Sequence, residues 1–194
     1  MSADISVPAN LEWLRRTESG AAWLASLPTL FAECADRWSL EVGDPFPYTF
    51  ASLAAPATTS DGTPVVLKIH FPDRESEHEA RALEVWNGDG AVRLLAHDAD
   101  RRALLLERCV PGTPLWEIGA QAALDVMVEL LPRLWKPAGP PIRPLAEEAA
   151  WWASYLPDTW ERAERPFERR LLDAALDALE VLPPTQSEQV LVHQ

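Results

Sequence analysis

The chain has few of the residues that build covalent or metal-bound frameworks. Its 194 residues include two cysteines, Cys34 and Cys109, which stand far apart and outside any CxxC spacing. This argues against a disulfide framework and fits a reducing compartment, so we expect both thiols to be buried. The four histidines are scattered, and His78-Glu79 lacks the second histidine of HExxH. No metal ligand set can therefore be named from the sequence.

Long apolar runs are also absent. No stretch reaches the roughly eighteen apolar residues of a membrane span, and MSADISVPANLEW at the N-terminus does not have the form of a secretory signal. We expect a cytoplasmic protein that does not enter a membrane. The net charge of −13 repels phosphate backbones and anionic lipid, and no basic run offsets it, so nucleic acid is not an expected partner. Such a field favours cationic small molecules, although acidity also serves solubility alone.

Several enzyme motifs are missing as well. The sequence contains no GxxxxGK[ST], GxSxG or redox CxxC pattern, and no repeat of solenoid length. What it does contain is 47% hydrophobic residues and nine tryptophans, enough for a sizeable core. A globular protein of one domain, or of two small ones, is predicted.

The pattern of elements changes along the chain. After an amphipathic helix over 28–38, with Pro28 in its first turn, short apolar runs and turn residues up to 107 predict strands and hairpins around a helix over 74–86. Beyond the break Pro111-Gly-Thr-Pro114, helical periodicity dominates. A sheet-rich half followed by a helical half indicates an α+β protein of two lobes.

One lysine stands out. The chain has only two, and Lys68 lies inside the apolar strand TPVVLKIH, where burying an ammonium is costly. Its stem could simply extend along the strand to water. Alternatively, a carboxylate from the following helix could pair with it: Glu79 shares a helical face with two large apolar residues, and Glu75 is the rival. These glutamates could equally be solvated and paired with Arg74 or Arg81.

Three co-linear stretches carry a resemblance: WSLEVGDPFPYTFASLAAPATTSDGTPVVLKIHFP, EHEARALEVWNGDGAVRLLAHDADRRALLLERCVPGTPLW and the terminal VLVHQ. Together they resemble the aminoglycoside and hydroxyurea antibiotic resistance kinases of the streptomycin 6-kinase type, from about Trp23 to the last residue. The resemblance implies an ATP-dependent O-phosphotransferase with a protein-kinase-like fold, using ATP and Mg. It implies an N-lobe over 1–108, a hinge over 109–114 and a partial helical C-lobe over 115–194.

The resemblance also implies roles for individual residues. Lys68 is expected to bind the α and β phosphates and Glu79 to orient it, as a fixed charge and its anchor suit phosphoryl transfer. Arginine would be a poorer point charge there. The end of the fifth strand and the hinge are expected to meet adenine through Leu106, Glu107, Arg108 and Cys109.

Two stretches depart from the kinase pattern. The loop GDPFPYTF has no GxGxxG, so backbone donors for phosphate are not evident there. VLVHQ resembles the start of the catalytic loop, with His193 as its first residue, but the sequence stops at Gln194, one position before the aspartate base. Since such a base is worth about 10²- to 10⁴-fold, we expect the 194-residue chain to be inactive.

Two functions remain open at this stage. The first is a kinase for a hydroxyl of an aminoglycoside such as streptomycin, or of hydroxyurea, of which this chain is an N-terminal part. The second is a non-catalytic module that binds nucleotide or associates with itself through uncovered apolar surface.

Overall fold

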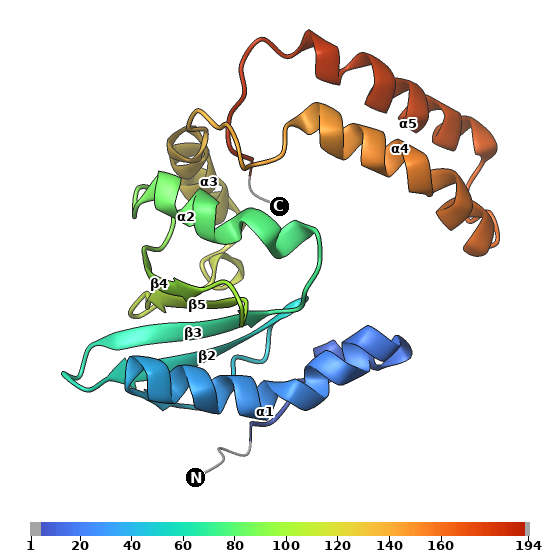
Figure 1. Cartoon of the computed structure of the whole chain (residues 1–194). Helices are drawn as coiled ribbons and strands as arrows, with labels where there is room; N and C mark the ends of the chain where they lie inside the picture. The colour runs from blue at the N-terminus through green and yellow to red at the C-terminus, as the bar shows by residue number, and fades with distance from the viewer. Residues whose placement is uncertain (1–4, 193–194) are drawn as a thin grey trace. The chain divides into compact units, whose positions relative to one another are not determined.

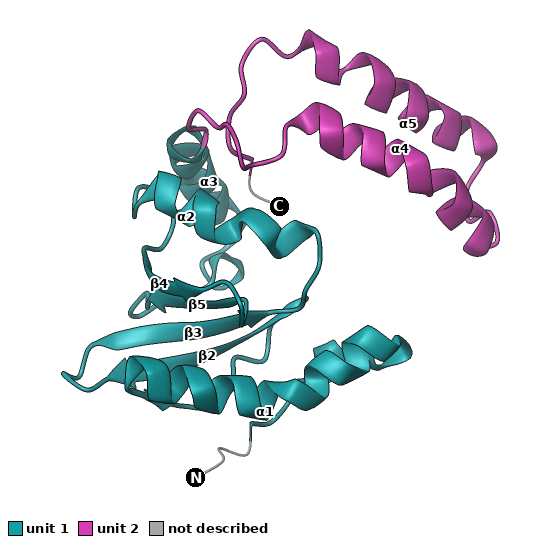
Figure 2. Ribbon diagram, in the orientation of Figure 1, with its two compact units in different colours: residues 1–134 teal, residues 135–194 magenta. Residues whose placement is uncertain are grey.

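The computed structural model describes residues 5–192 and confirms the α+β class. The chain divides into two compact units, residues 1–134 and residues 135–194 (Figure 2). The sequence placed the lobe boundary earlier, at 109–114. The hinge over 109–114 was expected because of its role in binding adenine. The division into two units does not test that role, so the hinge stays a prediction.

The first unit is built on an antiparallel sheet. Its strands are β1 (Leu40–Val42), β2 (Ser52–Thr59), β3 (Pro64–His70), β4 (Leu94–Asp98) and β5 (Ala103–Glu107), in the order β1-β2-β3-β5-β4. The two predicted hairpins are therefore present, although β4 begins three residues later than the apolar run. The turn between β2 and β3 contains Gly62 at φ 87°, a conformation that favours glycine.

Helix α1 (Glu18–Trp38) covers one face of the sheet (Figure 1). Before it lies η1 (Ala9–Arg16), and Thr17, the residue between the two, caps α1 because its side chain accepts from the N–H of Gly20. The expected start at Pro28 was wrong, because this cap sets the beginning of α1 and Pro28 lies inside the helix. The buried side chains shared by η1, α1 and the sheet include Leu11, Leu14, Trp23, Leu24, Leu27, Phe31, Cys34, Leu53, Ala55, Leu67, Ile69 and Ala103.

The opposite face of the sheet is the one toward α2 (Glu79–Trp86), which continues the short turn η2 (Glu75–His78) (Figure 1). After β5 come η3 (Leu115–Glu117) and α3 (Ala120–Leu134), which passes Pro132 and ends two residues later. Helices α2 and α3 are tied together by Trp86, whose indole N–H donates to the carbonyl of Leu134 at 2.9 Å.

The second unit is a pair of helices with a short two-stranded contact. Helices α4 (Leu145–Arg162) and α5 (Arg169–Val181) pack side by side, and η4 (Pro183–Thr185) follows (Figure 2). Val190 pairs with Pro137 in an antiparallel bridge, with the N–H of Leu191 donating to the carbonyl of Lys136 at 2.8 Å. The segment 189–191 is thus held against the start of its own unit.

The two cysteines differ in environment. Cys34 is buried in the core beneath α1, as expected, but Cys109 is exposed. The expectation for Cys109 was wrong because the chain leaves the sheet after Glu107, and the residues that follow are no longer covered on either face.

Candidate functional site

Lys68 lies in the middle of β3, between Ala54 of β2 and Leu104 of β5. Because side chains alternate along a strand, Val65, Leu67 and Ile69 enter the core, and Lys68 projects from the other face. Its side chain is 24% exposed. A central strand therefore carries a largely covered cation that needs a partner.

That partner is Glu79, the first residue of α2. The ammonium of Lys68 donates to Oε1 at 2.7 Å and to Oε2 at 2.9 Å. Leu83 and Trp86 on this helix are buried, and α2 contacts β4 of the sheet. Among the alternatives left open by the sequence, the rival Glu75 is exposed in η2, and Arg81 pairs instead with Glu84.

A third residue completes the cluster, and sequence reasoning missed it. His70 follows Lys68 by two positions, so it projects from the same face of β3. It is 6% exposed, and its Nε2 lies 3.1 Å from Oε2 of Glu79. By its geometry this nitrogen makes no hydrogen bond in the structure, so the two atoms are close neighbours rather than a formed pair. The period of two in the strand was the signal that could have identified it.

The cluster holds Glu79 ionised. Burial alone would raise the pKa of this carboxyl, but the contact with His70 and the charge of Lys68 outweigh burial and lower the pKa from 4.5 to about 2. Glu79 therefore carries a full negative charge at neutral pH, opposite a lysine ammonium. The arrangement fixes the position of a cation on a face of the sheet that α1 does not cover.

The residues expected near adenine stand at the end of β5. Leu106 is buried on the same face of the sheet as Lys68, because it pairs with Val66, two positions away from Lys68. The N–H of Glu107 donates to the carbonyl of Arg93 at 3.0 Å. Arg108 and Cys109 are exposed, and within residues 5–192 their backbone N–H groups have no backbone partner.

The loop over 43–51 replaces a glycine-rich turn with aromatic side chains. Tyr48 meets the ring of Trp116 edge-on at 5.8 Å, and Phe50 stacks on Trp13 at 5.5 Å. Asn10 donates to the carbonyl of Thr49. The loop is thus attached to η1 on one side and to η3 on the other.

Neither the catalytic-loop start nor a metal centre can be placed. His193 lies outside the described residues. Across the described part of the chain, no group of three His, Cys, Asp or Glu side chains could hold a metal ion. The described side chains therefore do not test the expected binding of magnesium.

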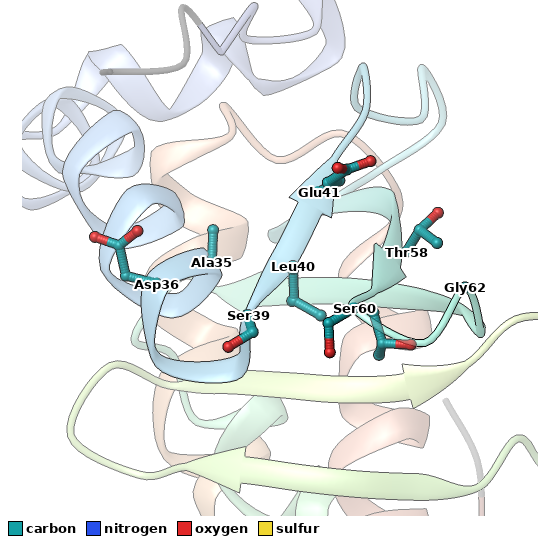
Figure 3. A pocket seen from close by; sticks show the side chains of 9 residues that line it. Ala35, Asp36, Ser39, Leu40, Glu41, Thr58, Ser60 and Gly62 are labelled. Atoms are coloured by element: carbon teal, nitrogen blue, oxygen red, sulfur yellow. The ribbon is translucent and has the colours of Figure 1, made fainter.

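A hollow of about 530 Å³ lies elsewhere on the first unit (Figure 3). It is formed where α1 ends, by β1 and by the turn between β2 and β3, and the carboxylates of Asp36 and Glu41 stand beside it. None of its lining residues belongs to the cluster of Lys68, Glu79 and His70. This cluster, which we call the β3–α2 cluster, is the candidate functional site.

Comparison with known proteins finds one family model and several similar proteins. The model of a family described as aminoglycoside/hydroxyurea antibiotic resistance kinase matches residues 37–194. A hydroxyurea phosphotransferase from Kitasatospora aureofaciens is 35% identical over 198 residues, covering 98% of this chain and 58% of that protein. A streptomycin 6-kinase from Streptomyces griseus is 35% identical over 176 residues, covering 90% and 57%. One from Streptomyces glaucescens matches at the same identity and coverage. The chain thus spans less than three fifths of the length of these relatives.

No helix in the described residues is both long enough and apolar enough to cross a bilayer.

Proposed function

Because the chain belongs to the aminoglycoside/hydroxyurea antibiotic resistance kinase family, we propose that it carries the nucleotide-binding part of an ATP-dependent kinase. The acceptor is a hydroxyl group of a small antibiotic, an aminoglycoside such as streptomycin or else hydroxyurea. The observation that carries the proposal is the pairing of Lys68 with both oxygens of Glu79.

Phosphoryl transfer places little demand on covalent chemistry by the protein, so positioning and charge stabilisation are the main contributions. A compact ammonium on a rigid strand suits the α and β phosphates of ATP. Glu79 restricts the positions that this ammonium can take. If Lys68 moved away entirely, an ionised carboxylate would be left without a partner in a partly buried site. Lys68 and Glu79 thus take the roles that the resemblance assigns to them.

Adenine recognition is assigned to the end of β5 and the residues after it. Leu106 offers an apolar side chain on the Lys68 face of the sheet. Arg108 and Cys109 are exposed, and their backbone N–H groups, which have no backbone partner within residues 5–192, are assigned to the edge of the purine. We therefore place adenine beside residues 106–109 and the phosphates beside Lys68, and we retain 109–114 as the hinge.

The described residues are assigned nucleotide binding rather than turnover. The kinase family implies a divalent metal as well as ATP, and among residues 5–192 no group of three His, Cys, Asp or Glu side chains could hold one. That these 194 residues alone do not phosphorylate an acceptor stays a prediction, checked by incubating them with ATP and streptomycin or hydroxyurea and looking for ADP.

Titration with ATP by calorimetry, with and without magnesium, tests the nucleotide site. We expect the chain to bind ATP and Lys68→Ala to weaken binding at least about tenfold, which corresponds to about 1.4 kcal/mol. The matched control is Lys136→Ala, which removes the only other lysine, from the second unit. Equal affinity for ATP in the wild type and Lys68→Ala would reject the role of Lys68.

A second candidate is self-association through the second unit. An apolar groove of about 340 Å³ runs between α4 and α5 and is lined by Leu145, Ala149, Trp152, Leu156, Ala175, Ala178, Leu179, Leu182 and Pro183. Leu182 is 56% exposed, and apolar surface of this kind promotes association. In this candidate function, a second copy of the chain binds in the groove. Sedimentation at several concentrations should show a dimer that Leu182→Glu dissociates, and a monomer at all concentrations would reject it.

A further inference from the structure

We propose that His70 is a positioning residue of the nucleotide site, one that holds the Glu79 carboxylate in place while the Lys68 ammonium engages phosphate. The inference rests on the proposed function and deepens it. His70 would not touch the nucleotide; it would act through Glu79.

The backbone of His70 is fixed on both sides. It lies opposite Ser52 of β2, and its N–H donates to the carbonyl of Arg102, just before β5, at 3.0 Å. The imidazole therefore starts from a backbone held between neighbouring strands. With 6% of its surface exposed, the ring cannot turn freely into solvent.

Within the described residues, Nε2 of His70 is a buried nitrogen without a hydrogen-bond partner. Leaving such a buried atom unpaired is unfavourable. Glu79 Oε2, at 3.1 Å, is the nearby acceptor, and a small rotation of the ring or of the carboxylate aligns the two. A hydrogen bond between Nε2 and Oε2 therefore requires only a small movement of either side chain.

The contact between His70 and Glu79 matters because Lys68 and His70 approach the same carboxylate. Lys68 donates to both oxygens, whereas His70 approaches Oε2 alone. When a phosphate attracts the ammonium, Lys68 must give up part of its hold on Glu79. With His70 at Oε2, the carboxylate keeps one partner and can still bind Lys68 through Oε1.

A histidine that merely filled space would predict a different outcome. Its replacement would lower stability but would leave the ionisation of Glu79 and the affinity for ATP unchanged. A positioning role predicts that both change together, and that a side chain which restores a donor at the place of Nε2 restores both.

The test compares two polar replacements of different reach. In His70→Gln the side-chain amide extends about as far as Nε2, and in His70→Asn it stops short. The control is His97→Asn, which alters an exposed histidine of β4. The ¹³C signals of the glutamate carboxyls are followed by NMR from pH 7 downward in the full chain, with amide spectra confirming that each variant is folded. ATP affinity is measured at pH 7.

We expect Glu79 to stay ionised to below pH 3 in the wild type, in His70→Gln and in His97→Asn, since its pKa is about 2. In His70→Asn its pKa should move upward toward 4.5, the ordinary value. ATP affinity should fall roughly three- to tenfold in His70→Asn alone, the size of effect expected from losing one hydrogen bond that supports the carboxylate.

The two readouts separate failure of this inference from failure of the proposed function. An unchanged Glu79 pKa in His70→Asn overturns the role of His70, whether or not ATP binds. If ATP binds the wild type and His70→Asn equally, the role is overturned as well. If the pKa moves as expected but the wild type does not bind ATP, His70 still positions Glu79, and it is the nucleotide function that fails.

Discussion

Replacing Glu79 by glutamine tests the energetics of the β3–α2 cluster. The pKa of this carboxyl falls from 4.5 to about 2, because the contact with His70 and the charge of Lys68 exceed the opposing effect of burial. At about 1.4 kcal/mol per tenfold change in proton affinity, the cluster contributes about 3 kcal/mol to the folded state at neutral pH. Glutamine keeps the shape but loses the charge, and it leaves Lys68 largely covered without a counterion.

The pH dependence has a definite direction. The folded state has the lower pKa, so it releases the proton more readily than the unfolded chain. The stabilisation is therefore complete above pH 4.5, and it is lost as the pH falls through about 2. We expect Glu79→Gln to lower the free energy of unfolding of the first unit by about 1 to 3 kcal/mol at pH 7, and by progressively less below pH 4.5.

Urea unfolding followed by tryptophan fluorescence, repeated between pH 7 and pH 3, measures this difference. The matched control is Glu84→Gln on the same helix, where the pair with Arg81 is about half exposed and should contribute less than about 0.5 kcal/mol. A Glu79→Gln variant as stable as the wild type at pH 7, or a difference that does not shrink on acidification, would refute the electrostatic account.

Three further predictions concern other parts of the first unit. Burial raises the pKa of Cys34 to about 11, so at pH 8 a thiol reagent should modify only the exposed Cys109 in the folded chain. In urea it should modify both cysteines, and two reactive thiols without urea would contradict this prediction. Trp86→Phe removes the donor to Leu134 and should lower stability by about 1 to 3 kcal/mol in thermal unfolding, while no loss would show that the bond is dispensable. A Cβ at Gly20 would overlap a backbone carbonyl of η1, so Gly20→Ala should cost at least about 2 kcal/mol, and normal stability would mean that η1 can move aside.

Much of the candidate site could be derived from local patterns. The apolar run around Lys68 has the composition of a strand, and the segment that ends at Trp86 has the periodicity of a helix. Strand and helix signals depend on neighbours within a few positions, which is why β3 appears where it was expected. The helix predicted over 74–86 is shorter than expected, because its first part is the 3-10 turn η2 and the α-helix begins only at Glu79. Glu79 was a candidate for the same reason, because helical spacing puts it beside Leu83 and Trp86.

Local patterns could not decide between two residues that fit the same role equally well. Nothing local distinguishes Glu75 from Glu79 as the partner of a lysine, because the answer depends on where η2 gives way to α2 and how that helix lies over the sheet. The same holds for His70, whose importance arises only when Glu79 arrives within 3.1 Å of it. Cys109 was misjudged because exposure depends on what surrounds the chain after β5.

The amino-acid sequence by itself determined the class of the fold, the strand with its isolated lysine and the helix with its acidic face, since each follows from side-chain order along a short segment. Only the tertiary structure decided which carboxylate meets Lys68, that a buried histidine shares it, and that the chain divides after Leu134. These outcomes depend on contacts between residues far apart in the chain, and such contacts are set by packing of whole elements rather than by the preference of any one of them.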